Sequence, residues 1–149
     1  MGWVDDLYGT TVGVDTAPFI YFIEEHPTYL GPVTEFFIAV DGGRISVVTS
    51  TVTLLEVLVQ PLRRQRDDLA RQYRNALLSA GGLVCEGVSS QIAEEAARLR
   101  ASYNLRTPDA IQLATAIKSG ATAFLTNDSF LTTVPDIEIL VLDQLVQLQ

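Results

Sequence analysis

The chain has 149 residues, of which 48% are hydrophobic and 19% are charged. This composition supplies enough apolar material for one core, which argues against disorder, and the length indicates a single domain. The formal net charge of −8 argues against a general nucleic-acid-binding surface, because contacts to phosphate require Lys and Arg. The same excess of acids would also fit a protein in which some carboxylates bind metal ions.

The cysteine content and the N-terminal residues bear on the cellular compartment. Cys85 is the only cysteine, so no internal disulfide can form, which fits a reducing cytoplasm. The first residues, MGWVDDLYG, lack the basic and apolar regions of a signal peptide. The apolar stretches are far shorter than the roughly 20 residues that span a bilayer. We therefore expect a cytoplasmic protein that does not enter the membrane.

The hydrophobic pattern predicts five strands that alternate with helices. In chain order we expect strand 10–15, helices 17–26 and 29–43, strand 44–50, helices 51–61 and 65–82, strand 83–89, helices 89–104 and 106–120, and strands 121–127 and 137–143. Pro61 is expected to end one of the helices, and Thr107 to cap another, with Pro108 in its first turn.

Four of these strands are nearly continuous apolar runs rather than alternating ones. That pattern is typical of a parallel sheet with both faces covered, so we predict an α/β fold with helices on each side. In such sheets a functional site lies beyond the carboxyl ends of the strands, close to a switch in strand order. Acids at strand ends are therefore the first candidates for chemistry.

Four acids fall where this rule would gather them. Asp15 closes the first strand, and Asp128 follows the strand at 121–127. Asp109 lies in the first turn of a helix, and Glu56 lies within the apolar stretch TLLEVLV. Each acid also has an ordinary structural explanation: Asp15 as a helix cap, Asp109 as a favourable charge at a helix start, Glu56 as a solvent-facing side chain and Asp128 as a turn former.

Taken together, the four acids favour a metal site. Several unpaired carboxylates in one place repel one another, and a divalent cation removes that repulsion. Carboxylate ligands suit Mg²⁺ or Mn²⁺, whereas a single His26 and a single Cys85 make zinc implausible. The chemistry expected of such a site is phosphoryl transfer or phosphodiester hydrolysis.

The stretches VGVDTAPFIYFIEEHP, TSTVTLLEVLVQPL, TPDAIQLATAIKSGATAFLTNDSFL and IEILVL resemble PIN-domain ribonucleases, from about Val12 to Leu142. The closest likeness is to the toxin of VapBC-type toxin–antitoxin pairs. The resemblance implies a three-layer α/β/α PIN-like domain with a five-stranded parallel sheet. The whole chain, 1–149, would be one domain, with an N-terminal extension at 1–10 and a core at about 11–143.

The resemblance also implies a metal-dependent endoribonuclease that uses Mg²⁺ or Mn²⁺. Asp15, Glu56, Asp109 and Asp128 match the acids of the family motif and would be both catalytic residues and metal ligands. Asp15 and Asp109 would bind the metal most directly, while Glu56 and Asp128 would complete the ligand set or deprotonate the attacking water.

Three polar neighbours, Thr16, Thr126 and Asn127, match positions that would orient the carboxylates. The implied partners are an RNA substrate, a small antitoxin protein and a second copy of the chain. A solitary PIN nuclease in RNA processing and a non-catalytic PIN-like binding module stay open as alternatives.

The basic residues cluster in sequence. Arg63, Arg64 and Arg66 begin an arginine-rich stretch that could bind RNA or an acidic partner. Asp67 and Asp68 lie within the same stretch, so a solvated helix face is the alternative. A looser set, Arg98, Arg100 and Arg106, precedes Asp109.

Five aromatic residues fall on the first two predicted helices and are expected to form core or an apolar self-association surface: Phe19, Tyr21, Phe22, Phe36 and Phe37.

Two other acid-based metal enzymes fit less well. A response-regulator receiver needs a lysine at a late strand end, but the only lysine, Lys118, lies in a predicted helix. A phosphatase of the haloacid-dehalogenase type needs a second Asp two residues after the first, where this chain has Ala17.

Overall fold

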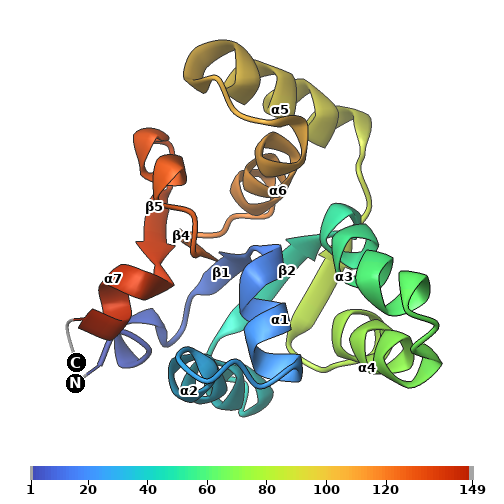
Figure 1. The fold of residues 1–149 in the computed structure, drawn as a ribbon. Coiled ribbons are helices and arrows are strands. Elements are labelled where there is room, and N and C mark those ends of the chain that lie inside the picture. Colours follow the sequence, from blue (N-terminus) through green and yellow to red (C-terminus); the bar gives the residue numbers. More distant parts are fainter. Residues whose placement is uncertain (1, 148–149) are drawn as a thin grey trace.

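The computed structural model describes residues 2–147, which form a central sheet flanked by helices (Figure 1). In chain order the elements are the 3-10 helix η1 (Asp5–Leu7), β1 (Thr11–Val14), α1 (Thr16–Ile23), α2 (Leu30–Asp41), β2 (Ser46–Ser50), α3 (Thr51–Arg63), α4 (Asp67–Leu78), β3 (Leu83–Glu86), α5 (Ser90–Tyr103), α6 (Thr107–Lys118), β4 (Ala123–Thr126), the 3-10 helix η2 (Ser129–Thr133), β5 (Glu138–Val141) and α7 (Leu142–Gln147).

All five strands are parallel and lie in the order β3-β2-β1-β4-β5. Val12 of β1 is in register with Val47 of β2 on one side and with Ala123 of β4 on the other. The strand order therefore reverses at β1, which has β2 and β4 as its neighbours. In open parallel sheets this reversal opens a crevice beyond the carboxyl ends of the two strands, and that crevice is the usual ligand site.

Apolar side chains fill both sides of the sheet. One cluster, which includes Phe19, Phe36 and Tyr73, packs α1, α2 and α4 against one face. A second cluster, which includes Leu99 and Leu113, packs α5 and α6 against the opposite face, as Figure 1 shows. The predicted three-layer α/β/α fold with a five-stranded parallel sheet is confirmed.

Helix α6 lies close against β1 because Gly13 has no side chain. A Cβ atom at Gly13 would lie 2.5 Å from the Cβ of Ala116 and 2.9 Å from Cδ1 of Phe124, and both distances are shorter than packed atoms tolerate. This close packing brings Gln112 of α6 to 3.0 Å from the hydroxyl of Thr16, the first residue of α1. The contact joins α6 to the strand-end crevice.

The prediction that Pro61 ends its helix is wrong. Pro61 lies inside α3, which continues to Arg63. A proline lacks only its own N–H donor, so the helix can continue for two more residues when the loss of that single bond is tolerated. The N–H of Arg64 then caps the helix by donating to the carbonyls of Gln60 and Leu62.

Two other boundaries also differ from the prediction. Thr107 does not cap α6: the N-cap residue is Arg106, and Thr107 is the first helical residue, whose hydroxyl accepts from Arg100 at 3.0 Å. The last strand ends at Val141, because Leu142 already begins α7. A terminal helix this short has too few residues to show a helical period in the sequence.

The residues before β1 pack onto the domain. Val4 and Leu7 are only 1% and 6% exposed and belong to the core cluster that covers α1 and α2. The segment expected to be an extension therefore contributes to the core. Within residues 2–147, no helix is both long enough and apolar enough to cross a bilayer.

Candidate active site

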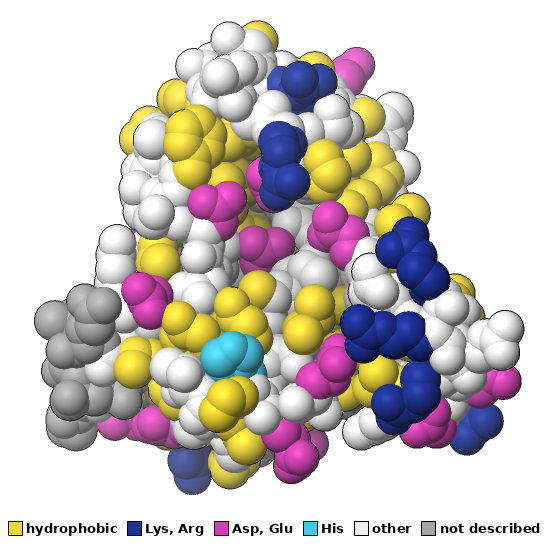
Figure 2. All heavy atoms as spheres, in the orientation of Figure 1, with side chains coloured by type: hydrophobic (Ala, Val, Ile, Leu, Met, Phe, Trp, Pro, Cys, Tyr) yellow, Lys and Arg dark blue, Asp and Glu magenta, His cyan; other side chains and the backbone are white. Residues whose placement is uncertain are grey.

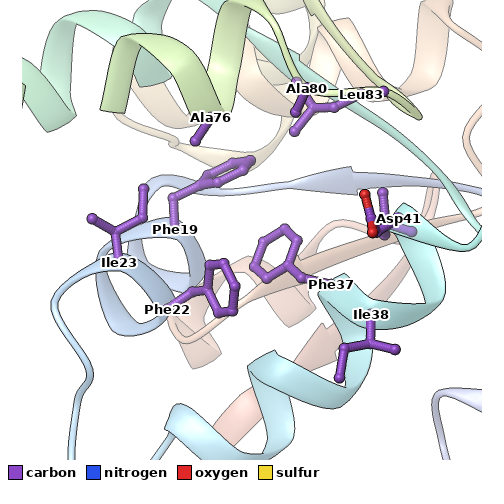
Figure 3. Close-up of a pocket in the computed structure, with 11 residues that line it drawn as sticks. Phe19, Phe22, Ile23, Phe37, Ile38, Asp41, Ala76, Ala80 and Leu83 are labelled. Carbon is purple, nitrogen blue, oxygen red and sulfur yellow. The ribbon is translucent and has the colours of Figure 1, made fainter. Parts of the chain in front are cut away.

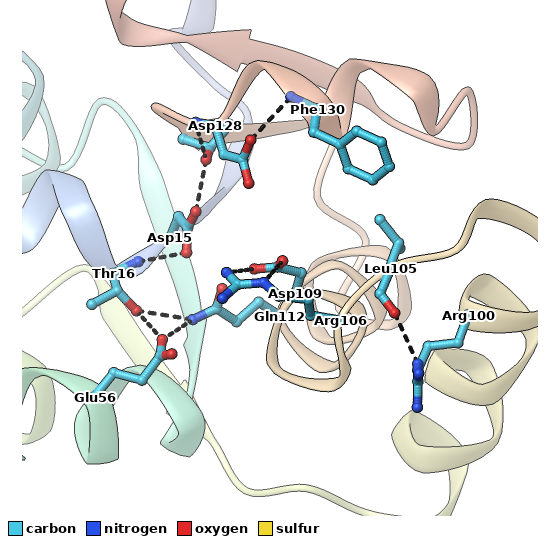
Figure 4. A network of polar contacts seen from close by, with 11 residues as sticks. Asp15, Thr16, Glu56, Arg100, Leu105, Arg106, Asp109, Gln112, Asp128 and Phe130 are labelled. Atoms are coloured by element: carbon cyan, nitrogen blue, oxygen red, sulfur yellow. Dashed lines mark hydrogen bonds and ion pairs between the residues drawn. The ribbon is translucent and has the colours of Figure 1, made fainter.

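The carboxylate of Asp15 is held at the junction of β1 and β4. Its Oδ1 accepts from the backbone N–H of Thr16 at 2.7 Å, and its Oδ2 accepts from the hydroxyl of Thr126 at 2.6 Å. Asp15 thus caps α1, as its ordinary structural explanation required, and also lies in the crevice between the two strands. One oxygen serves the cap and the other faces β4, so the capping role is compatible with the predicted site (Figure 4).

Glu56 comes to the same place from α3. Its Oε1 accepts from the hydroxyl of Thr16 at 2.6 Å and from Nε2 of Gln112 at 3.1 Å. The same Nε2 lies 3.0 Å from the hydroxyls of both Thr16 and Thr53. A three-element network from α1, α3 and α6 therefore fixes one oxygen of Glu56, which rules out a simple solvent-facing role.

Gln112 is the member of this network that the sequence did not single out. Its side chain is 3% exposed, and its Oε1 has no hydrogen-bond partner among the described residues. A signal was present in the sequence, because Gln112 follows Asp109 by three residues and therefore shares its helix face. A buried polar residue next to a candidate acid on that face was the clue.

Asp109 lies in the first turn of α6 and is 8% exposed. Both of its oxygens accept from Arg106: Nε lies 3.0 Å from Oδ2, and Nη2 lies 3.4 Å from Oδ1. The side chain of Arg106 is 76% exposed. A positive charge is therefore attached to one of the acids, although the sequence had placed Arg106 only in a loose basic set.

Asp128 shows the turn chemistry expected of it. Its Oδ1 accepts from the N–H of Phe130 at 3.0 Å and caps the 3-10 helix η2. Its own N–H donates to the hydroxyl of Thr126 at 3.1 Å, and that hydroxyl in turn donates to Asp15. Thr126, which is fully buried, thus connects the two strand-end acids.

Asn127 points to a different set of partners from its neighbours. Its Nδ2 donates to the hydroxyl of Tyr21 at 3.0 Å, and its Oδ1 accepts from the N–H of Asp143 at 2.9 Å. These bonds tie the end of β4 to α1 and to α7. Among residues 2–147, Asn127 therefore has no hydrogen bond to the four candidate acids, whereas Thr16 and Thr126 both bind a carboxylate directly.

The environment of the crevice disfavours the charged form of Asp15. The pKa of Asp15 is raised to about 6, mainly by burial and also by the nearby charges of Asp109 and Glu56, against the lowering effect of the hydrogen bonds from Thr126 and Thr16. A positive ion would relieve this accumulation of negative charge. The oxygen donors match the preference of Mg²⁺ and Mn²⁺.

The acids nevertheless do not form a finished metal cage. Among residues 2–147, no group of three or more Asp, Glu, His or Cys side chains is arranged to hold an ion. The carboxylates are bound instead by Thr16, Thr126 and Arg106. The donor chemistry of the carboxylates fits a hard cation.

Figure 2 shows acidic side chains in the hollow between the α5–α6 side of the molecule and the α1–α3 side, with basic side chains at its border. The predicted arginines Arg63, Arg64 and Arg66 lie at the end of α3 and in the turn to α4, and all three are exposed. Arg66 is paired with Asp68 at 2.9 Å. None of the three has an ion pair with a candidate acid among the described residues.

An apolar groove lies on the same side of the sheet as α1. It has a volume of about 360 Å³ and is lined by α1, α2, the end of α4 and β3 (Figure 3). Phe19, Phe22 and Phe37 form its aromatic wall, and Phe22 and Ile38 are 37% and 66% exposed. The predicted aromatic set is therefore divided: Phe19 and Phe36 are buried core, while Phe22 belongs to an open apolar surface.

Comparisons with known proteins agree with this architecture. The PIN domain family profile matches residues 12–136. A comparison with curated proteins gave no match. Among solved structures, VapBC2 from Rickettsia felis bound to a promoter DNA fragment is similar with a TM-score of 0.68 and 15% identity, over 88% of this chain and 98% of that one.

Two further structures are similar. A toxin–antitoxin complex from Klebsiella pneumoniae has a TM-score of 0.64 and 24% identity, over 89% of this chain and 98% of the other. VapC20 of Mycobacterium tuberculosis, a sarcin-ricin loop cleaving toxin, has a TM-score of 0.67 and 19% identity, over 83% and 95%. At these identities the likeness concerns the fold, whereas the profile match covers most of the sequence. The chain therefore belongs to the PIN-domain family.

Proposed function

We propose that this chain is a metal-dependent endoribonuclease and that it is the toxin of a type II toxin–antitoxin pair. The observation that carries the proposal is that Asp15, Glu56 and Asp109, from three separate elements, meet at the strand-end crevice: Thr16 binds both Asp15 and Glu56, and the charge of Asp109 acts on Asp15. Membership of the PIN family and the likeness to VapBC toxins support the reaction class.

The proposed cofactor is Mg²⁺ or Mn²⁺, held by Asp15 and Asp109 with Glu56 and Asp128 beside them. When bound, the ion neutralises charge that develops on the phosphate and makes water a better nucleophile. Asp15 is suited to this role because its charge is disfavoured by burial in the absence of a counter-charge. Thr126 and Thr16 fix the direction of its two oxygens.

Glu56 is the proposed proton acceptor. Its hydrogen bonds from Thr16 and Gln112 both end on Oε1, so Oε2 is left to take a proton from the attacking water. The buried network around Gln112 restricts the rotation of the carboxylate. Asp128, which follows β4 and caps η2, supplies a fourth negative charge at the mouth of the crevice.

The proposed partners are an RNA substrate, an antitoxin and a second copy of the chain, all in the cytoplasm. The solved relatives include complexes of toxin with antitoxin. The groove formed by Phe19, Phe22 and Phe37 offers an apolar surface that an antitoxin segment could cover. A solitary RNA-processing nuclease is the alternative, and an antitoxin gene next to this one in the genome would decide between them.

RNA cleavage in Mn²⁺ or Mg²⁺ tests the proposal. Wild type should cleave, chelation with EDTA should stop the cleavage, and Asp15→Asn should remove it. The matched control is Asp41→Asn, which makes the same chemical change at an exposed position at the end of α2. Equal cleavage by Asp15→Asn and by wild type would refute the nuclease assignment and favour a non-catalytic binding module.

A further inference from the structure

Arg106 is the one cation bound to a candidate acid in the part of the chain that the structure describes. Its guanidinium reaches both oxygens of Asp109, at 3.0 and 3.4 Å. Asp109 is nearly buried, whereas the Arg106 side chain is mostly exposed and covers the carboxylate from the solvent side. Figure 4 shows the guanidinium beside Asp109, over the crevice that contains Asp15 and Gln112.

The charge of Arg106 acts on more than its direct partner. The hydrogen bond to Asp109 raises the pKa of Arg106, and the charges of Asp128 and Glu56 add to the effect. Arg106 is therefore within electrostatic reach of three of the four proposed catalytic acids. The neighbouring Arg100 is not available for this, because it donates to the carbonyl of Leu105 at 2.8 Å and to Thr107.

The fold does not need the Arg106 side chain. Arg106 is the N-cap residue of α6, but no side-chain bond caps the helix there. Its contribution to the helix start comes from its backbone carbonyl, which accepts from the N–H of Ala110 at 3.0 Å. Any residue at this position would supply that carbonyl, so the guanidinium is free for another use.

We propose that Arg106 is a phosphate-binding residue that holds Asp109 only until a divalent cation takes the same oxygens, and then binds the RNA backbone beside the acids. The inference rests on the proposed function. A guanidinium and a hard cation need the same lone pairs of Asp109, so they compete. Because Arg106 is exposed, its ion pair is weak and readily exchanged.

The released guanidinium is well suited to phosphate. Arginine keeps its charge, and its planar donors match two phosphate oxygens at once. The chain has a net charge of −8, which repels RNA. A cation at the mouth of the acid-lined crevice would attract the RNA backbone locally. One local cation next to the acids is more effective than a distant basic patch, since exposed charges are screened beyond about 10 Å.

The two halves of the proposal predict effects of opposite sign in Arg106→Gln. Mn²⁺ should bind about three- to fivefold more tightly, because the competing ion pair is gone. RNA should bind about tenfold more weakly, because a charged phosphate contact is lost. The salt dependence of RNA binding should also decrease, by a slope of about 0.7 for one contact to a single strand.

Mn²⁺ binding is measured by electron paramagnetic resonance without RNA. RNA binding is measured by fluorescence anisotropy of a labelled oligouridylate in Ca²⁺, with the integrity of the RNA checked on a gel. Arg44→Gln is the matched control, since it removes the same charge from an exposed position before β2, at the opposite edge of the sheet. Arg106→Lys should bind Mn²⁺ as wild type does and keep the salt slope, but bind RNA more weakly than wild type. Thermal melts establish that each variant is folded.

Unchanged or weaker Mn²⁺ binding in Arg106→Gln would overturn the competition, and RNA binding equal to that of Arg44→Gln would overturn the phosphate contact. Either result leaves the nuclease assignment intact. If wild type does not bind Mn²⁺, or if Asp15→Asn binds Mn²⁺ as wild type does, the proposed function itself fails. This inference then fails with it.

Discussion

The crevice and the apolar groove differ in chemistry, yet a single short helix contributes to both. The N-terminal end of α1 presents Thr16 to the acids, and its later residues Phe19 and Phe22 line the groove. Polar side chains in the crevice are joined by hydrogen bonds, whereas the groove is a wall of aromatic and aliphatic groups. Opposite ends of α1 therefore contribute to a polar surface and to an apolar one, which suit two different kinds of ligand.

Each region also has a feature that is energetically unfavourable without a ligand. The crevice brings carboxylates together and raises the pKa of Asp15. The groove leaves large apolar side chains in contact with water, as the exposure of Ile38 shows. A cation would stabilise the first region and an apolar protein segment the second. If the two regions act independently, a mutation in one region should leave the function of the other unchanged.

The largest expected effect is in the crevice. Glu56→Gln keeps the shape and the acceptor oxygen for Thr16 and Gln112 but loses the proton acceptor. Cleavage of RNA should fall more than about 100-fold, beyond the range of lost supporting contacts. Single-turnover cleavage in Mn²⁺ measures this, with Glu94→Gln on the exposed face of α5 as the control. A loss below about threefold would remove Glu56 from the chemistry.

A smaller loss is expected where the crevice network is weakened without removing an acid. Gln112→Leu deletes the bonds to Thr16, Thr53 and Glu56 while keeping the volume. Cleavage should fall by about 10- to 100-fold, because Glu56 loses its orientation. The pH profile of the remaining cleavage activity should also differ from that of wild type. Gln91→Leu, an exposed position on α5, should change neither quantity.

The stability of the crevice should depend on pH through Asp15. Its pKa is about 6 in the folded chain and 3.8 ordinarily, so the folded state binds more protons between these values and stability falls as pH rises through them. Asp15→Asn should therefore be more stable than wild type above pH ~6, by about 3 kcal/mol, given about 1.4 kcal/mol per pKa unit.

Urea unfolding in EDTA measures this difference. The gap between Asp15→Asn and wild type should shrink as pH decreases towards ~4, where the carboxyl is protonated in both states. Asp41→Asn should show no such trend. A wild type that is more stable than Asp15→Asn at neutral pH would show that the hydrogen bonds from Thr16 and Thr126 outweigh the cost of burial.

The smallest expected effect on cleavage comes from the groove. Phe22→Asp places a charge on the apolar wall that Phe37 shares. Cleavage should stay within about twofold of wild type, since no groove residue bonds to an acid. Inhibition by a cognate antitoxin should weaken strongly, because a buried unpaired charge opposes docking. Thr132→Asp on exposed η2 is the control for added charge.

Much of the fold could be read from the sequence because it rests on repeated local signals. Apolar runs with acids at their ends predicted β1 and β4, and Gly and Pro marked the helices between the strands. The position of Asp15 followed from a general rule about parallel sheets. Pro61 was misjudged because a proline near a helix end removes only one bond, a loss that neighbouring packing can absorb.

The site was only partly predictable, since its contacts join residues distant in sequence. Thr16 and Glu56 are 40 positions apart, and Thr126 and Asp15 are 111 apart. Gln112 and Arg106 each lie three residues from Asp109, but the partners of Gln112 on α1 and α3 are distant in sequence and no local pattern points to them. Asn127 was expected among the carboxylates, but its amide turns towards Tyr21, because a residue after a strand end can point to either side.

The most direct test of this account is single-turnover RNA cleavage in Mn²⁺ by three proteins side by side: wild type, Asp15→Asn and Phe22→Asp. The account predicts that Phe22→Asp cleaves within about twofold of wild type and that Asp15→Asn is slower by more than about 100-fold. Full cleavage by Asp15→Asn, or an equal loss in both variants, would contradict a catalytic crevice that is separate from the groove.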